Sequence, residues 1–412
     1  MAVWSFNRGE WTEAYVFLHL LGTGRIYGAT EKLTKDEQTY INIVNIIRDE
    51  PSRLLVFERF LQDDQAYISV KEGDCKIMII TAPELNEKAA FLYDSIKGIT
   101  AGNRKISVVK IQEYLEGLNI DTPKANLSAD AKEKYGSKAD IIVTSEDSSD
   151  HARRTEGFSI KSHLGSSPTL FNGSQTSGFR YEIKNCNETL MHTINALDSF
   201  VEMISYIKEN LSLTFSGCRN EIFADNLDLV DSSLAQVLNG VVLSAIGYNK
   251  KSATRNLPDI CAAVTEDNPL GKRHPELFYV SKIRDFLFAA FAGMTACTIW
   301  NGRKKLTGGY IDVNQNGEML YYRAISDEVF CNYLLQYTYL DLLDRGRNKD
   351  VAVVKARAYL ESREATDNEI TFASKKTDGT LKPVKGNYGY VYQKDGIFYI
   401  DINFQIRFKN VR

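Results

Sequence analysis

The chain has 412 residues, of which 43% are hydrophobic and 25% charged, and this composition excludes an extensively disordered or fibrous protein. Its length suffices for about two or three compact units with sizeable cores. The formal net charge of −3 excludes a chain-wide attraction to nucleic acids, so any such binding must rest on local clusters of basic side chains.

The first half is predicted to mix helices and strands. A helix is expected over 10–21, where Trp11, Leu18 and Leu21 recur at helical spacing and Gly22 ends the run. A second helix is predicted over 35–49, ahead of Pro51. The next predicted elements are a strand at 75–80, helices at 84–96 and 107–117, and strands at 138–143, 157–162 and 179–185.

The second half is predicted to be helical first and then rich in hairpins. Helical patterns cover 188–210 and most of 225–300, with a polar break at 265–276. A hairpin at 308–325 is expected to turn at Asn316-Gly317, a helix to cover 330–343, and a C-terminal hairpin to turn at Asp395-Gly396. The whole order predicts a mixed α/β (α+β) fold, divided into regions 1–190, 191–300 and 301–412.

Cysteine spacing and apolar runs narrow the class of protein. The six cysteines form no CxxC pair, so we expect no structural zinc site. The N-terminal segment has no apolar core of a signal peptide, and no apolar run reaches the roughly 20 residues that span a bilayer. An intracellular protein without a membrane segment is therefore expected.

Two charged residues stand at strand ends that a hairpin would bring together. Asp140 heads the strand ADIIV, and Lys161 ends the strand GFSIK. If the two strands pair, the carboxylate and the ammonium meet at one end of the sheet. An aspartate can hold a divalent cation that activates water, and a nearby lysine can orient that water and offset charge in the transition state. The pattern predicts a metal-dependent phosphodiesterase.

The second carboxylate of such a site is the open question. The position two before Lys161 is Ser159, a weak metal ligand, where an acidic residue is usual. Glu13, or alternatively Glu10, can supply the acid from the first turn of the first helix, although both also suit the positive end of a helix. A competing site uses Glu182 in FRYEIKN, which puts Asp140 two strands away.

Several blocks of sequence, in order, resemble the HpaII-type restriction endonucleases of the PD-(D/E)xK nuclease superfamily. They are NRGEWTEAYVFLHLL, KADIIV, GFSIKSHLGSSPTLFNGS, WNGRKKLTGGYIDV and YGYVYQKDGIFYIDINFQIRF, and together they span nearly the whole chain. GFSIKSxLGSxPTL is the most specific of them. The resemblance implies a type II enzyme with a restriction-endonuclease-like mixed sheet flanked by helices, a helical insertion and a C-terminal part rich in β-hairpins.

The resemblance also implies roles for individual residues. Asp140 becomes the metal-binding aspartate and Lys161 the catalytic lysine, with Ser159 at the position of the missing acid. Glu13 and the peptide carbonyl of Ile160 become further ligands of Mg²⁺, or of Mn²⁺ in its place. Region 1–190 is then the catalytic core, 191–300 mainly helical, and 301–412 a β-rich region expected to contact DNA.

The implied substrate is double-stranded DNA, with CCGG as the leading target. Neutral donors in the loop after Lys161 suit phosphate and base contacts, and basic residues suit guanine. The candidates are Ser162, Ser166, Ser167, Thr169, Asn172 and Gln175 in that loop, and Lys272, Arg273, Arg303, Lys304 and Lys305 elsewhere. The chain is also expected to be longer than the type enzyme, through insertions within 185–300 that alter target recognition.

The family further implies a setting for the enzyme. It is a bacterial or archaeal cytoplasm with a companion DNA methyltransferase on the same target, and a palindromic target favours a homodimer. Two other functions stay open at this point. One is a nuclease of the same superfamily that acts on DNA structure in repair or recombination. The other is a non-catalytic DNA-binding protein, suggested by Ser159.

Overall fold

The structure is a computed structural model in two compact units. It describes every residue except 1, 31–33, 51–52, 99–104, 166, 174–175, 198, 250–252, 303–306, 324–326, 344–350, 356–369, 376–380, 384–388 and 410–412. Unit 1 comprises Met1–Pro168, Arg303–Tyr333 and Asn410–Arg412, and unit 2 comprises Thr169–Gly302 and Leu334–Lys409. Both units therefore contain segments that are distant in the sequence.

Unit 1 is built on a nine-stranded sheet with the order β1-β12-β11-β7-β6-β2-β3-β4-β5. Its strands are β1 (Arg25–Ala29), β2 (Lys35–Glu50), β3 (Arg53–Gln62), β4 (Gln65–Glu72), β5 (Cys75–Thr81), β6 (Ile141–Asp147), β7 (Arg153–Ser162), β11 (Gly309–Val313) and β12 (Met319–Arg323). Most neighbours are antiparallel, but β11 runs parallel to β7 and β1 runs parallel to β12. The mixed sheet thus joins both sequence segments of the unit.

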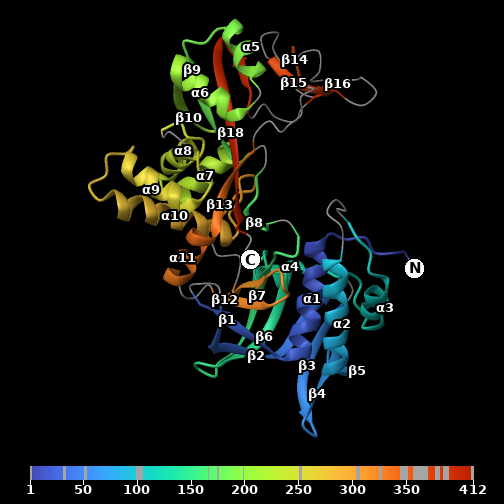
Figure 1. The fold of residues 1–412 in the computed structure, drawn as a ribbon. Helices are drawn as coiled ribbons and strands as arrows, with labels where there is room; N and C mark the ends of the chain where they lie inside the picture. Colours follow the sequence, from blue (N-terminus) through green and yellow to red (C-terminus); the bar gives the residue numbers. More distant parts are fainter. Residues whose placement is uncertain are drawn as a thin grey trace. The chain divides into compact units, whose positions relative to one another are not determined.

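Helices pack on this sheet and form the core with it. They are α1 (Arg8–Thr23), α2 (Ala82–Lys97) and α3 (Val109–Gly117), and Figure 1 shows α1 and α2 side by side. The short helix α4 (Ala129–Tyr135) has no buried residue and lies outside this core. The ring of Phe17 on α1 meets that of Phe57 on β3 edge to face, with 4.9 Å between centroids. Trp11, Phe17 and Leu18 are fully buried, and each such side chain contributes roughly 1.5–3 kcal/mol or more. This burial fixes α1 against the sheet.

The helix predicted over 35–49 is wrong, because these residues form strand β2. Ile41, Ile43 and Ile46 are buried in the core, and their spacings of two and three residues fit a strand with an irregularity. The register of β2 against β6 indeed shifts between Ile43 and Asn45. β-Branched side chains favour the pleated sheet, and pairing with both β3 and β6 decides the outcome.

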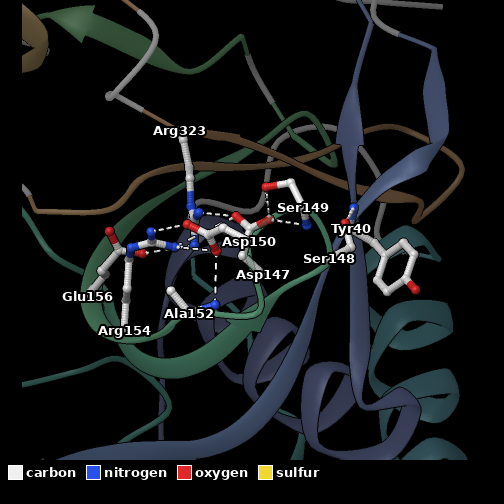
Figure 2. A network of polar contacts seen from close by, with 9 residues as sticks. All are labelled: Tyr40, Asp147, Ser148, Ser149, Asp150, Ala152, Arg154, Glu156 and Arg323. Carbon is white, nitrogen blue, oxygen red and sulfur yellow. Dashed lines mark hydrogen bonds and ion pairs between the residues drawn. The ribbon is translucent and has the colours of Figure 1, made fainter.

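An ion-pair network holds the far end of the hairpin formed by β6 and β7 (Figure 2). Arg323 of β12 contacts the carboxylates of Asp147 and Glu156, and Arg154 contacts that of Asp150. Asp147 and Glu156 are 5% and 6% exposed, so their charges need these partners. The network thus stabilises the end of the hairpin that lies opposite to Asp140 and Lys161.

Unit 2 contains a second sheet, covered by helices. Its path is β10-β9-β18-β13, and β8 and β17 also pair with β18. The strands are β8 (Thr169–Phe171), β9 (Gly178–Lys184), β10 (Ser212–Cys218), β13 (Thr338–Leu343), β17 (Val391–Lys394) and β18 (Ile397–Phe408). The helices of the unit are α5 (Glu188–Ala196), α6 (Phe200–Asn210), α7 (Glu221–Val230), α8 (Leu234–Ala245), α9 (Leu257–Asp267) and α10 (Pro275–Phe291).

A cluster of aromatic rings forms the core of unit 2. Phe171 stacks on Phe223 and Phe404, at 5.6 and 5.9 Å between centroids, and meets Phe286 at 5.2 Å. These residues come from β8, α7, β18 and α10, so the cluster ties the helical part of the unit to its sheet. A separate sheet of β14 (Val351–Lys355), β15 (Ile370–Lys375) and β16 (Leu381–Pro383) has the order β14-β15-β16.

Both predicted hairpins are confirmed, and one predicted helix is corrected. Gly317 has φ +87°, and Asp395 and Gly396 have φ +51° and +81°, which suit tight turns between strands. The helix predicted over 330–343 is wrong in its second half. Helix α11 (Asp327–Tyr337) ends where Thr338 begins β13, because residues 338–343 pair antiparallel with β18.

The fold class is confirmed as mixed α/β, with extensive sheets, flanking helices and a β-rich C-terminal part. The division into regions 1–190, 191–300 and 301–412 concerns function and stays a prediction. No helix among the described residues is long and apolar enough to span a bilayer.

Candidate active site

The hairpin of β6 and β7 brings the two predicted charged residues to one end of the sheet. Ile141 lies opposite Phe158, and the N–H of Asp140 donates to the carbonyl of Phe158 at 2.8 Å. Asp140 thus stands immediately before β6, and Lys161 stands near the end of β7. The absence of a side chain at Gly157 lets the segment before Asp140 lie close to β7, because a Cβ there would lie 2.3 Å from the carbonyl oxygen of Tyr135.

One oxygen of Asp140 is held by β7. Its Oδ2 accepts hydrogen bonds from the hydroxyl of Ser159 at 3.0 Å and from the N–H of Ile160 at 2.8 Å. Ser159 therefore donates to the predicted metal-binding aspartate. The N–H and carbonyl of one strand residue point to the same side, so the Ile160 carbonyl also points away from β11, toward Asp140. Oδ1 of Asp140 accepts neither of these two bonds.

Helix α1 carries Glu13 to this end of the sheet. Its N-terminus has a capping box, in which Asn7 and Glu10 exchange side-chain to backbone bonds. The hydroxyls of Thr12 and Ser162 lie 2.9 Å apart, and Arg8 Nη1 donates to the carbonyl of Leu164 at 3.3 Å. These bonds join the first turns of α1 to the end of β7, directly beside Lys161.

The electrostatics support Glu13 as the partner of Asp140. Burial and the nearby charge of Asp140 raise the pKa of Glu13 to about 8, although the N–H of Ala125 donates to Glu13 Oε2 at 3.0 Å. Burial likewise raises the pKa of Asp140, and the positive charge of Lys161 opposes that shift. Two carboxylates that repel each other in a half-buried position are what a divalent cation stabilises.

The two alternative acids have other surroundings. Glu10 closes the capping box and pairs with Lys124 Nζ at 3.0 Å; despite its burial, the bond to the Asn7 backbone and this ion pair lower its pKa. Glu182 lies on β9 in unit 2, opposite Thr214 and Tyr399, and so belongs to a different sheet from Asp140. Neither arrangement joins these acids to the Asp140 and Lys161 pair.

Lys161 is half-buried between charges of both signs. Burial lowers its pKa, while the carboxylates of Asp140, Glu13 and Asp312 raise it. Its Nζ lies 5.4 Å from the ring centroid of Tyr310, in cation–π range. A lysine in this position can donate to a phosphate oxygen or hold a water molecule beside it.

Three residues near Lys161 were missed by the sequence analysis. Tyr310 and Asp312 lie opposite Ser159 and Lys161 on β11, and His163 follows two residues after Lys161. His163 Nε2 and Asp312 Oδ1 are 3.0 Å apart. The alternating pattern of GYIDV is typical of a strand. Its parallel pairing with β7 could not be predicted from the sequence, because the two strands are far apart in the chain.

The predicted DNA-contacting residues are dispersed in the structure. Ser162 bonds to Thr12 and accepts from the N–H of Leu164, Thr169 opens β8 opposite Arg407, and Asn172 is exposed. Lys272 lies over the ring of Phe278 at 4.4 Å, and Arg273 beside it is exposed. Ser167 lies in the loop after Lys161. Ser166, Gln175, Arg303, Lys304 and Lys305 lie outside the described residues.

The donor set fits a magnesium ion better than a transition metal. Among the described residues, no group of three or more histidine, cysteine, aspartate or glutamate side chains could hold a metal. Glu13 and Asp140 instead offer two carboxylates, and the peptide of Ile160 offers a carbonyl oxygen. Mg²⁺ is commonly bound by one or two carboxylates, with water and substrate phosphate completing its shell. The residues present therefore fit the implied ion.

Comparison with known proteins agrees with this geometry. The family model of the HpaII restriction endonuclease matches residues 7–349. The type II restriction enzyme HpaII of Haemophilus parainfluenzae is 28% identical over 407 residues, covering 98% of each chain. The expected extra length is therefore wrong with respect to this relative, because the two chains align almost end to end. No solved structure matches the chain. The chain belongs to the HpaII restriction endonuclease family.

Proposed function

We propose that this type II restriction endonuclease hydrolyses phosphodiester bonds of double-stranded DNA at the site formed by Asp140, Glu13 and Lys161. Family membership makes the chain a sequence-specific deoxyribonuclease. The observation that carries the proposed site is the hydrogen bonding of Asp140 to Ser159 and Ile160, which aligns the aspartate with the lysine one residue further on. The electrostatic coupling of Glu13 to Asp140 supplies the second acid.

The proposed cofactor is Mg²⁺, with Mn²⁺ able to replace it. Asp140, Glu13 and the carbonyl of Ile160 would hold the ion. When bound, it lowers the pKa of its water and neutralises charge on the scissile phosphate. Restriction endonucleases as a class require a divalent metal, and the carboxylate pair is the reason that this chain suits a hard cation.

The chain's own residues orient the reactants. The Ser159 hydroxyl and the Ile160 N–H fix one oxygen of Asp140, which leaves the other free of these two bonds. The Lys161 ammonium orients the attacking water or donates to a phosphate oxygen as negative charge develops in the transition state. Ser159 thus serves by holding Asp140, although it replaces the usual acid.

The proposed target is CCGG, cut by a homodimer, with a methyltransferase protecting the same sequence. A two-fold symmetric enzyme matches a palindromic site. Neutral donors after Lys161, namely Ser162, Ser167, Thr169 and Asn172, are proposed to contact phosphates and bases, and Lys272 and Arg273 to contact guanine or phosphate. Bacterial or archaeal cells are the proposed setting.

The site is tested with a matched pair of lysine and glutamate variants. Lys161→Ala is expected to lower the cleavage rate of unmethylated plasmid by about 10³-fold or more, because it removes the positive charge that stabilises the negatively charged transition state. Its binding to the same DNA in Ca²⁺ should stay within about threefold of wild type. Glu182→Ala, on the other sheet, should keep nearly full cleavage. An active Lys161→Ala beside an inactive Glu182→Ala would overturn the assignment.

A further inference from the structure

The strand beside β7 carries a further carboxylate next to Lys161. β11 runs parallel to β7, with Tyr310 opposite Ser159 and Asp312 opposite Lys161. Residues in register on adjacent strands point to the same face, so the Asp312 and Lys161 side chains share one face of the sheet. The carboxylate of Asp312 therefore stands beside the lysine, on the opposite side from β6 and Asp140.

Asp312 is itself held in a defined position. His163 Nε2 lies 3.0 Å from Asp312 Oδ1, and the two residues are only 2% and 9% exposed. His163 is fixed in turn, because its N–H donates to the carbonyl of Val313 at 2.8 Å. His163 thus orients the buried carboxylate of Asp312. Without such a partner, a carboxylate at this position would lose the favourable hydration that it has in water.

Tyr310 completes the surroundings of the lysine. It is 2% exposed, and its ring lies 5.4 Å from Lys161 Nζ. The ring and the carboxylate on β11 restrict where the flexible lysine chain can place its ammonium. A lysine has about 2 kcal/mol of rotamer entropy, so partners on both sides are needed to hold one geometry.

We propose that Asp312 is a positioning residue that, held by His163, orients the Lys161 ammonium toward the scissile phosphate. This inference rests on the proposed function of Lys161. It assigns to β11 a negative charge beside the ammonium, in addition to the metal-binding carboxylates proposed for Asp140 and Glu13. Asp312 acts through Lys161 and needs no contact with DNA or metal.

The test compares Asp312→Asn with Asp147→Asn. Both replace a buried aspartate of the same sheet, 9% and 5% exposed respectively. Asp147 ends β6 and lies seven residues from Asp140, which is roughly 20 Å along the strand. The readouts are the single-turnover cleavage rate of unmethylated plasmid in Mg²⁺, the Kd for the same DNA in Ca²⁺, and the Tm.

The expected result separates positioning from stability. Asp312→Asn should lower the cleavage rate by about 10- to 100-fold while Kd changes by less than about threefold. Asp147→Asn should lower the Tm and keep the rate within about twofold of wild type. His163→Gln keeps a donor near the position of Nε2 and should retain most of the rate. His163→Leu removes the donor and should resemble Asp312→Asn.

Two outcomes would overturn the inference, and they are distinct from failure of the proposed function. A rate for Asp312→Asn within about twofold of wild type would exclude a role for the carboxylate. Equal rate losses in both aspartate variants, in proportion to their Tm losses, would show a structural role only. An active Lys161→Ala, measured in parallel, would instead remove the proposed function on which the inference depends.

Discussion

At the residue scale, the site is a set of half-buried charges whose pKa values depend on one another. Glu13 and Asp140 repel each other, and both have raised pKa values because of burial first and, for Glu13, the neighbouring charge second. Lys161 lies close enough to offset part of that repulsion. Without a cation the two carboxyl groups, Glu13 and Asp140, therefore bind protons more tightly in the folded protein than in the unfolded chain.

This gives a pH-dependent stability with a definite sign. The pKa of Glu13 is about 8 in the folded metal-free protein and near 4.5 in the unfolded chain, so its contribution is complete below about 4.5 and is lost as the pH rises through about 8. In EDTA, the Tm of wild type should fall relative to that of Glu13→Gln between pH 5 and 8. Thermal melts of both proteins across that range test this, and parallel curves would contradict the surroundings assigned to Glu13.

Metal affinity should depend on pH in the opposite sense. Mg²⁺ must displace the proton from Glu13, so binding should strengthen as the pH rises from about 6 to 8 and should release protons. Calorimetric titrations in two buffers of different ionisation enthalpy measure that release. Glu13→Gln is expected to weaken Mg²⁺ binding and to reduce its pH dependence, because only Asp140 then remains to lose a proton. Unchanged binding by this variant would assign the ion to other ligands.

At the element scale, the hairpin of β6 and β7 has the proposed catalytic residues at one end and an ion-pair network at the other, structural end. The structural end is the network around Asp147 and Arg323 (Figure 2). Arg323→Met removes a cationic partner from the carboxylates of Asp147 and Glu156. The free energy of unfolding of unit 1 should therefore fall by about 2 kcal/mol. Its Tm should drop by roughly 5 °C while the cleavage rate at 25 °C is retained. A large rate loss without a Tm change would place chemistry at this end.

The attachment of α1 to β7 is the other element that matters for the site. Thr12 bonds to Ser162 and Arg8 to Leu164, so the helix that carries Glu13 is fixed to the strand that carries Lys161. Thr12→Val keeps the size of the side chain and removes its hydroxyl, which should lower the free energy of unfolding by about 1 kcal/mol. We expect a several-fold weaker Mg²⁺ affinity in the same calorimetric titration, because Glu13 loses its alignment. An affinity equal to wild type would show that packing alone positions α1.

The sequence predicts the local part of this site and misses its long-range part. Asp140 and Lys161 could be paired because β6 and β7 are adjacent in the chain and end in polar residues. The strand β2 can be mistaken for a helix because Tyr40, Ile43, Val44 and Ile47 recur at helical spacing. Asp312 and His163 were not predicted, because the parallel pairing of β11 with β7 joins segments about 150 residues apart.

At the scale of the whole molecule, each compact unit is assembled from separate stretches of the chain. Unit 1 needs residues 303–333 to complete the sheet beside Lys161, and unit 2 needs the C-terminal strand β18 to complete its own sheet. Truncation at about residue 300 should therefore remove β11 and β12 from unit 1 and abolish cleavage. Unit 1 is therefore not the N-terminal part of the sequence alone, which local patterns could not reveal.

The most direct test of the central claim is digestion of unmethylated plasmid DNA in Mg²⁺ and in EDTA, followed by sequencing of the fragment ends. We predict discrete fragments in Mg²⁺, ends at CCGG, and intact plasmid in EDTA. Fragments at another sequence would leave the enzyme class in place and reject CCGG. Intact plasmid in both Mg²⁺ and Mn²⁺, or equal cleavage in EDTA, would contradict a metal-dependent site at Asp140, Glu13 and Lys161.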